Sequence, residues 1–229
     1  MRCLYRWTLG KDLDNPLLNE DAHLASRAKH IYAVSDGASE SFASRRWSRI
    51  LVSCFLRKAD ITQQTLIKAI AKYESGFDRP NMSWSAQASY DRGSYATMLG
   101  VQIFDDGASI LGIGDSLAVL ADGSSIKATF PYVSANQFHA NPLLLSTIPD
   151  RNEGVLEEEI TTFWSFAGLE QPIVYAMTDA LGAWLLADGH QRLSQIQRLT
   201  SQHDFDQLVL SARADATMRT DDTTLIVIG

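Results

Sequence analysis

The sequence of 229 residues contains only two cysteines, Cys3 and Cys54, and no long hydrophobic run. Two cysteines do not make a disulfide framework, so we expect both to be buried, reduced thiols in a cytoplasmic protein. No segment reaches the roughly 18 apolar residues of a membrane helix. The first residues also lack the apolar core of a signal peptide. These absences argue against secreted proteins and membrane partners.

Positive charge is also scarce. Lysine and arginine total 20 against 27 aspartates and glutamates, a formal net charge of −7. Because nucleic-acid binding calls for a basic face, we expect no nucleic-acid partner. An acidic protein that handles phosphorylated molecules would need a cation to offset repulsion.

Three signatures of other hydrolase chemistries are missing. There is no G-x-x-x-x-G-K-[ST] loop of a nucleotide hydrolase and no G-x-S-x-G serine nucleophile. A cysteine phosphatase needs an arginine six residues after its cysteine, and Leu9 and Asp60 hold those positions. The chain also has no internal repeat and no linker, so we expect one domain over residues 1–229.

Apolar periodicity predicts the secondary structure. The strand over 31–34 is followed by a helix, for which Ser39 is the expected N-cap. The clustered strands and grouped helices favour an α+β fold with antiparallel sheets over alternating βα units. Segment 75–93 is turn-rich, and segment 122–170 is expected to be irregular with short strands. Glu157 to Glu159 are expected on a solvated face or turn. The expected strands cover 3–9, 31–34, 95–104, 109–113, 117–121, 173–177 and 224–228, and the expected helices 42–55, 62–74, 180–187, 191–200 and 204–214.

Acidic residues recur at the ends of apolar runs. Each position alone is also what a turn between strands would contain, since Asp and Gly are common turn residues. Gathered at one sheet edge, however, carboxylates repel one another and call for a compensating cation. A hard divalent ion such as Mg²⁺ or Mn²⁺ takes carboxylate and carbonyl oxygens. The positions are Glu20 and Asp21, Asp36 before Gly37, Asp115, Asp179, and Asp221 with Asp222.

Six segments in order carry a resemblance to a known family. They are NEDA (19–22), VSDGAS (34–39), GSYATMLG (93–100), GIGDS (112–116), MTDAL (177–181) and DDTTLIVI (221–228). Together they cover nearly the whole chain and resemble the metal-dependent Ser/Thr protein phosphatases, the PPM or type-2C family, in its short bacterial form. The resemblance implies an α-β-β-α sandwich of two antiparallel sheets flanked by helix pairs.

The resemblance also implies the chemistry and the site. The expected activity is hydrolysis of phosphomonoesters on phosphorylated proteins, the products of a Ser/Thr kinase, by a water that bridges two Mn²⁺ or Mg²⁺ ions. By motif, the metal ligands would be Asp36, the Gly37 carbonyl, Asp179 and Asp221, with Asp115 at a weaker third ion. By the same match, Glu20, Asp21 and Asp36 would serve catalysis.

The sequence departs from the family at several positions. Many members have a phosphate-binding arginine where this chain has Pro16, and Lys11 or another basic residue would have to replace it. The usual Ser-Asp-Gly is Thr178-Asp179-Ala180. These departures keep an alternative open, a weak or inactive phosphatase-like module that binds a phosphorylated or protein partner. The substrate, the preferred metal and the oligomeric state are left open.

Overall fold

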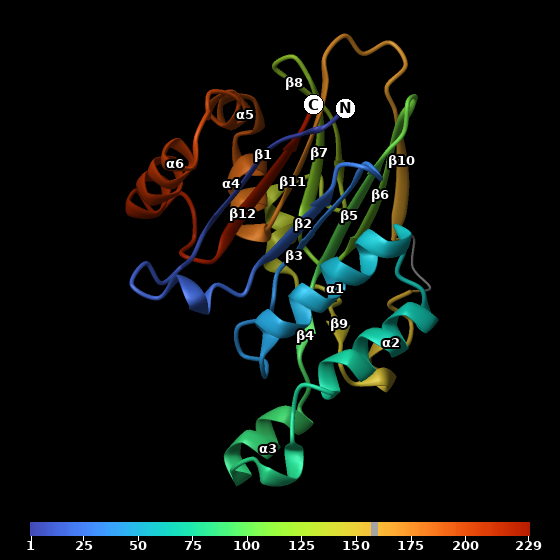
Figure 1. Ribbon diagram of the computed structural model, residues 1–229. Helices are drawn as coiled ribbons and strands as arrows, with labels where there is room; N and C mark the ends of the chain where they lie inside the picture. The colour runs from blue at the N-terminus through green and yellow to red at the C-terminus, as the bar shows by residue number, and fades with distance from the viewer. Residues whose placement is uncertain (157–159) are drawn as a thin grey trace.

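A computed structural model describes residues 1–156 and 160–229. Two five-stranded antiparallel sheets lie face to face at its centre, with helices on both outer faces (Figure 1). The expected Glu157 to Glu159 face lies outside the described residues. No helix in the described parts of the chain combines the length and the apolar character needed to cross a bilayer.

The first sheet has the order β1-β12-β11-β7-β8. Its outer face carries a core of Leu, Val, Tyr and Trp side chains, which pack against three helices from the C-terminal part of the chain. Its strands are β1 (Cys3–Leu9), β7 (Leu117–Asp122), β8 (Ser125–Phe130), β11 (Pro172–Met177) and β12 (Thr223–Ile228), and its helices are α4 (Asp179–Ala187), α5 (Gly189–Gln197) and α6 (Gln202–Ala214).

The second sheet has the order β10-β6-β5-β3-β2 and is covered by two helices. The apolar stripe of α1 meets this sheet, and Trp47, Leu51 and Phe55 are among its most buried side chains. The elements are β2 (Ala22–Ser26), β3 (Ile31–Ser35), β5 (Met98–Ile103), β6 (Gly107–Ile113), β10 (Thr161–Ser165), α1 (Ser44–Lys58) and α2 (Gln63–Glu74).

A third apolar core fills the space between the sheets. It takes the inward side chains of both, among them Val34, Leu99, Ile110, Ala176 and Ile226. Alternation along each strand supplies one set of side chains to this middle core and the other to the helices. The layers are therefore α-β-β-α, which confirms the expected fold class.

Most expected elements are present, and two differ. Ser39 is not the cap of the first helix, because the chain turns through residues 38–43 and α1 begins only after Ala43, whose φ is 51°. The turn-rich segment contains a short helix, α3 (Trp84–Asp91), which projects from the body in Figure 1. The irregular segment contains the short strands β8 and β10, and both cysteines are free and buried, as expected.

Candidate functional site

Both sheets direct the acidic residues to one end of the sandwich. Antiparallel neighbours place the end of one strand beside the start of the next, and each acidic segment occupies such a junction. The termini mark the opposite end, where the backbone N–H of Arg2 donates to the Gly229 carbonyl at 2.7 Å. The junctions are Glu20 and Asp21 before β2, Asp36 after β3, Asp115 between β6 and β7, Asp179 after β11, and Asp221 and Asp222 before β12.

Asp36 and Gly37 are held by the segment that precedes β5. The Asp36 backbone N–H donates to Thr97 Oγ1 at 2.9 Å, and its carbonyl accepts from Thr97 N at 2.8 Å. A Cβ on Gly37 would lie 2.9 Å from the Ser44 carbonyl carbon and 3.0 Å from the Glu20 carbonyl oxygen. Because these two atoms belong to the backbone and cannot move aside easily, only a glycine at position 37 can lie this close to both α1 and the Glu20 segment.

Asp21 is a buried carboxylate with one unpartnered oxygen. Its Oδ2 accepts hydrogen bonds from the hydroxyls of Thr178, at 3.1 Å, and Thr224, at 2.7 Å. Its Oδ1 is buried and has no hydrogen-bond partner. Burial, together with the negative charges of Asp222 and Asp221, raises the pKa of Asp21 to about 7, although both threonine hydrogen bonds act to lower it. This carboxyl can therefore change protonation near neutral pH.

Asp36 and Asp115 are affected in the same direction. Burial raises the pKa of Asp36 well above its ordinary value, and the charges of Asp21, Asp221 and Asp115 raise it further. Burial also raises the pKa of Asp115, with a contribution from Asp221. Carboxylates from four separate junctions thus repel one another, as expected for groups that a cation would stabilise.

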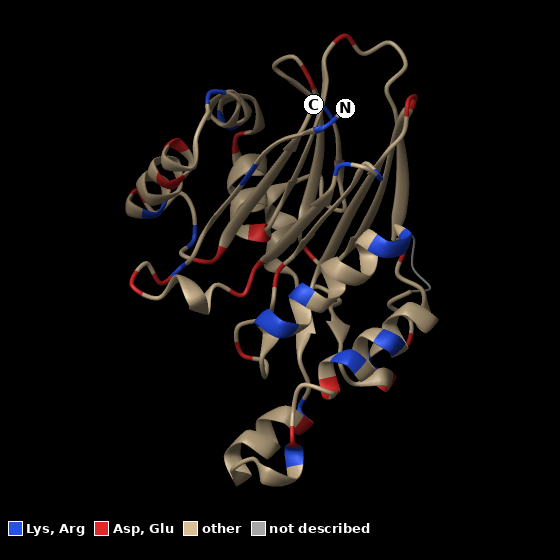
Figure 2. Ribbon diagram, viewed as in Figure 1, with Lys and Arg blue, Asp and Glu red and all other residues tan. Residues whose placement is uncertain are grey.

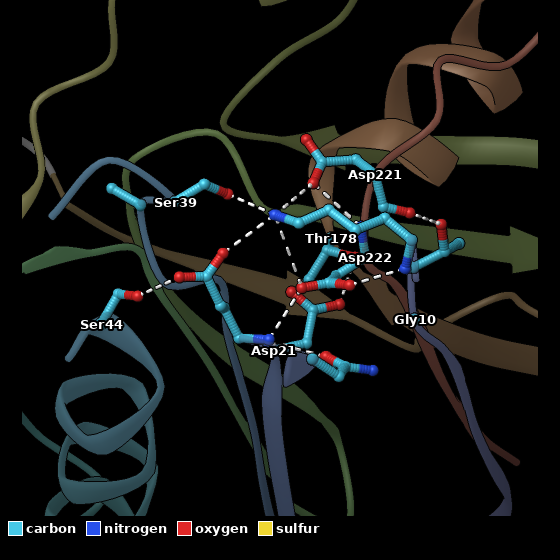
Figure 3. A network of polar contacts seen from close by, with 12 residues as sticks. Gly10, Asp21, Ser39, Ser44, Thr178, Asp221 and Asp222 are labelled. Atoms are coloured by element: carbon cyan, nitrogen blue, oxygen red, sulfur yellow. Dashed lines mark hydrogen bonds and ion pairs between the residues drawn. The ribbon is translucent and has the colours of Figure 1, made fainter. Parts of the chain in front are cut away.

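Lys11, in the loop after β1, lies among three carboxylates. Its Nζ donates to Glu20 Oε2 at 2.9 Å and lies 3.6 Å from Asp221 Oδ1. Nζ also donates to Ser39 Oγ, on the turn after Gly37 (Figure 3). The hydrogen bond to Glu20 raises the pKa of Lys11, while burial acts to lower it. Lys11 therefore stays cationic at the edge of the acidic group.

Asp222 fixes the backbone of this edge. Its Oδ1 accepts from Lys11 N at 2.8 Å and its Oδ2 accepts from Glu20 N at 2.7 Å. Both oxygens of the buried carboxylate are therefore engaged in tying two loops together. The side chain of the neighbouring residue, Asp221, lies instead between Lys11 and Arg219.

Arg219 is the second cation of the site, and the sequence analysis missed it. Its Nη2 forms an ion pair with Asp179 Oδ2 and lies 3.4 Å from Asp221 Oδ2. Arg219 is the only basic residue in 214–229 and stands two positions before Asp221, a signal that the sequence does contain. It joins Asp179 and Asp221, two of the metal ligands that the resemblance implies.

The acidic side chains converge without forming a closed metal cage. In residues 1–156 and 160–229, no three His, Cys, Asp or Glu side chains are grouped closely enough to hold a metal ion. Lys11 and Arg219 lie against the outer carboxylates instead. The expected residues are therefore assembled at one edge, with cationic side chains among them.

Comparison with solved structures identifies the fold. No protein-family model and no curated protein matches the sequence. Serine/threonine phosphatase Stp1 from Staphylococcus aureus matches with a TM-score of 0.63 and 15% identity, over 99% of this chain and 94% of Stp1. The catalytic domain of PstP in complex with two manganese ions matches with a TM-score of 0.58 and 13% identity, over 97% and 95%.

The fold is that of the type-2C phosphatases. A third match with this fold is PppA, described as a key regulatory component of the type VI secretion system in Pseudomonas aeruginosa. It has a TM-score of 0.61 and 17% identity, with 98% of this chain and 95% of PppA covered. The resemblance found in the six motifs and the type-2C fold agree over nearly the whole chain.

Proposed function

We propose that this chain is a Mn²⁺- or Mg²⁺-dependent phosphatase that hydrolyses phosphomonoesters on phosphorylated proteins. The observation that carries the proposal is the meeting of Asp21, Asp36, Asp115 and Asp221 at one end of the sandwich, where burial and neighbouring carboxylates raise the pKa of Asp21, Asp36 and Asp115. Neighbours with the same fold are serine/threonine phosphatases. A Ser/Thr kinase in the cytoplasm would supply the substrate.

The donor set fits divalent cations. All the candidate ligands offer oxygen atoms, which Mg²⁺ and Mn²⁺ prefer. The buried Oδ1 of Asp21 has no hydrogen-bond partner. Gly37 has no Cβ, so its backbone can lie close to its neighbours at the site. Asp36, Gly37, Asp179 and Asp221 would hold two ions, and Asp115 a weaker third. When bound, the ions would supply positive charge for the phosphoryl group and an acidified water.

The carboxylates beside the proposed ions would fix positions. The pKa of about 7 at Asp21 belongs to the metal-free protein, and bound cations would lower it and keep this carboxylate ionised. Glu20 is oriented by the Ser44 hydroxyl, which donates to its Oε1, and by Lys11 on Oε2. Asp36 is anchored through its backbone to Thr97. All three can thus be held in a fixed relation to a bound phosphate.

Lys11 is our candidate for the lost phosphate-binding arginine. Pro16, at the family's arginine position, begins a short 3-10 turn and provides no cation. Lys11 enters the site from the loop before that turn, and its side chain is 30% exposed. Its ammonium is therefore accessible to a phosphoryl oxygen, as a point charge in place of an arginine fork.

A second function is supported by the position of Arg219. An arginine that neutralises Asp179 and Asp221 reduces the need for a metal ion there. The alternative is a weak or inactive phosphatase-like module that binds a phosphorylated or protein partner.

Metal binding and hydrolysis separate the two functions. Calorimetry with Mn²⁺ and hydrolysis of p-nitrophenyl phosphate should both respond to the metal, and EDTA should abolish turnover. Asp36→Asn and Asp179→Asn should each lose Mn²⁺ affinity and activity. Asp105→Asn is the matched control, because Asp105 is exposed in the β5–β6 turn, at the other end of β5 from Thr97. Turnover indifferent to EDTA and to both site variants would falsify the proposal, and absent Mn²⁺ binding would favour the module.

A further inference from the structure

The helical layer over the second sheet is basic, although the chain is acidic. Residues 44–74, which contain α1 and α2, hold seven lysines and arginines against two acids, a net charge of +5 in a chain of −7. Figure 2 shows Lys and Arg repeated along both helices. Charge of one sign on one layer favours ligands of the opposite sign.

The basic residues of this layer lack counter-ions. Within the described parts of the chain, none of the lysines and arginines of residues 44–74 forms an ion pair, whereas Lys11, Arg79 and Arg219 do. Arg45 and Arg49 differ from the others in two respects. The Nε of Arg45 is buried without a hydrogen-bond partner. Burial and the charge of Arg45 lower the pKa of Arg49, which indicates two cations held close together. A buried donor without a partner costs free energy that a bound acceptor would recover.

Arg46, between them in sequence, is used differently. Its Nη2 donates to the Lys72 carbonyl at 3.2 Å, and its guanidinium lies 5.3 Å from the centre of the Phe77 ring. Arg46 thus ties α1 to the end of α2. The uncommitted cations on this part of α1 are the pair at i and i+4, Arg45 and Arg49, which share one helix face.

A hollow lies on each side of this pair. One, of about 470 Å³, is lined by Arg45, Arg49 and Lys72. The other, of about 410 Å³, runs from the same two arginines past His23 to Asp21. Burial and the charge of Arg6 lower the pKa of His23, so the positive charge of the second hollow comes from the arginines.

The second hollow leads to the proposed phosphatase centre. Ser44 and Ser48, one position before each arginine, bind the Glu20 side chain and the Glu20 carbonyl, the latter at 2.7 Å. The face of α1 next to the arginine face therefore contacts the centre directly. An extended chain with one residue at the centre can place its neighbours along the arginines.

We infer that Arg45 and Arg49 form a docking groove for acidic residues that flank the phosphorylated residue of a polypeptide substrate. The inference rests on the proposed function for the identity of the occupant. It narrows the substrate class to acidic phosphopeptides. The paired arginines would bind carboxylates of the polypeptide, and apolar lining residues such as Leu24 and Val52 would contact its other side chains.

Two phosphothreonine peptides of equal length test the inference, one with four glutamates around the phosphothreonine and one with glutamines there. The measured quantity is the ratio of their kcat/KM values with Mn²⁺. For the double variant R45Q/R49Q we expect this ratio to fall roughly tenfold, because two partly exposed charge contacts are lost. R57Q/K58Q is the control, with the same charge change on the exposed last turn of α1.

A second readout does not depend on catalysis. Fluorescence anisotropy of the unphosphorylated glutamate peptide should show weak binding that falls with rising salt and is reduced in R45Q/R49Q. If R57Q/K58Q changes the ratio or the binding as much as R45Q/R49Q does, the inference that Arg45 and Arg49 form a docking groove is wrong. Tighter binding of duplex DNA, or of phosphatidylserine vesicles, than of the peptide would also overturn it. Failure to hydrolyse p-nitrophenyl phosphate would instead contradict the proposed function, while anisotropy would still decide the groove.

Discussion

Replacing Asp21 by asparagine should stabilise the metal-free protein at high pH and not at low pH. The pKa of Asp21 is raised to about 7 by burial and by neighbouring carboxylates. A carboxyl with a raised folded-state pKa binds its proton more tightly when folded. The folded protein therefore loses stability as pH rises from the ordinary pKa of 3.8 toward about 7.

The size of the effect follows from the shift. About three pH units at 1.36 kcal/mol each give a penalty of about 4 kcal/mol for ionising Asp21 in the folded state. Of this, about 2–3 kcal/mol develops between pH 5 and pH 8. Asparagine carries no such penalty, and its carbonyl oxygen can still accept from Thr178 and Thr224, as Oδ2 does.

Asparagine also introduces a cost that does not depend on pH. Its amide NH₂ would take the place of Oδ1, which has no partner, and an unsatisfied buried donor costs about 1–3 kcal/mol. The net gain at pH 8 is therefore about 1–3 kcal/mol, and at pH 5 the variant should be no more stable than the parent.

Urea unfolding in EDTA at pH 5, 6, 7 and 8 measures this difference. The free energy of unfolding of Asp21→Asn minus that of the parent should rise by about 2–3 kcal/mol across the range. Asp204→Asn is the control, for which the difference should be negative and constant from pH 5 to pH 8, because hydrogen bonds with Thr200 and Ser201 lower the pKa of Asp204 and it is ionised in both states over this range. A difference for Asp21→Asn that is flat with pH would refute the electrostatic account of the site.

Three further changes test other parts of the site. Gly37→Ala should cost about 1–3 kcal/mol of stability in urea unfolding, because the new methyl would meet the backbone of Ser44 at 2.9 Å. Asp222→Asn should cost about 1–3 kcal/mol, because an amide can accept only one of the two backbone N–H groups, those of Lys11 and Glu20, that the carboxylate accepts; an unchanged unfolding curve would contradict this. Lys11→Met should raise the KM for p-nitrophenyl phosphate about tenfold through loss of a charge-assisted contact, and recovery with Lys11→Arg would distinguish phosphate binding from loss of packing.

The sequence by itself indicated most helices and strands and the candidate carboxylates, whereas the α-β-β-α layers were expected only from the family resemblance. Strand periodicity and helical stripes are local signals, and they predicted β1, β11, β12 and α2 with ends within one or two residues. The acids at the ends of apolar runs were visible for the same reason. The single domain over 1–229 and the roles of the site residues stay predictions.

Contacts between distant segments were decided only by the tertiary structure. Ser39 looked like a helix cap, but in the structure its hydroxyl accepts from Lys11, 28 residues away in sequence, and α1 starts later. Arg219 stands beside Asp221 in the sequence, but its ion pair with Asp179 depends on how β11 and β12 align, which the sequence does not show. The raised pKa values arise from charges brought together by both sheets, and periodicity in one segment does not reveal the distance between two others.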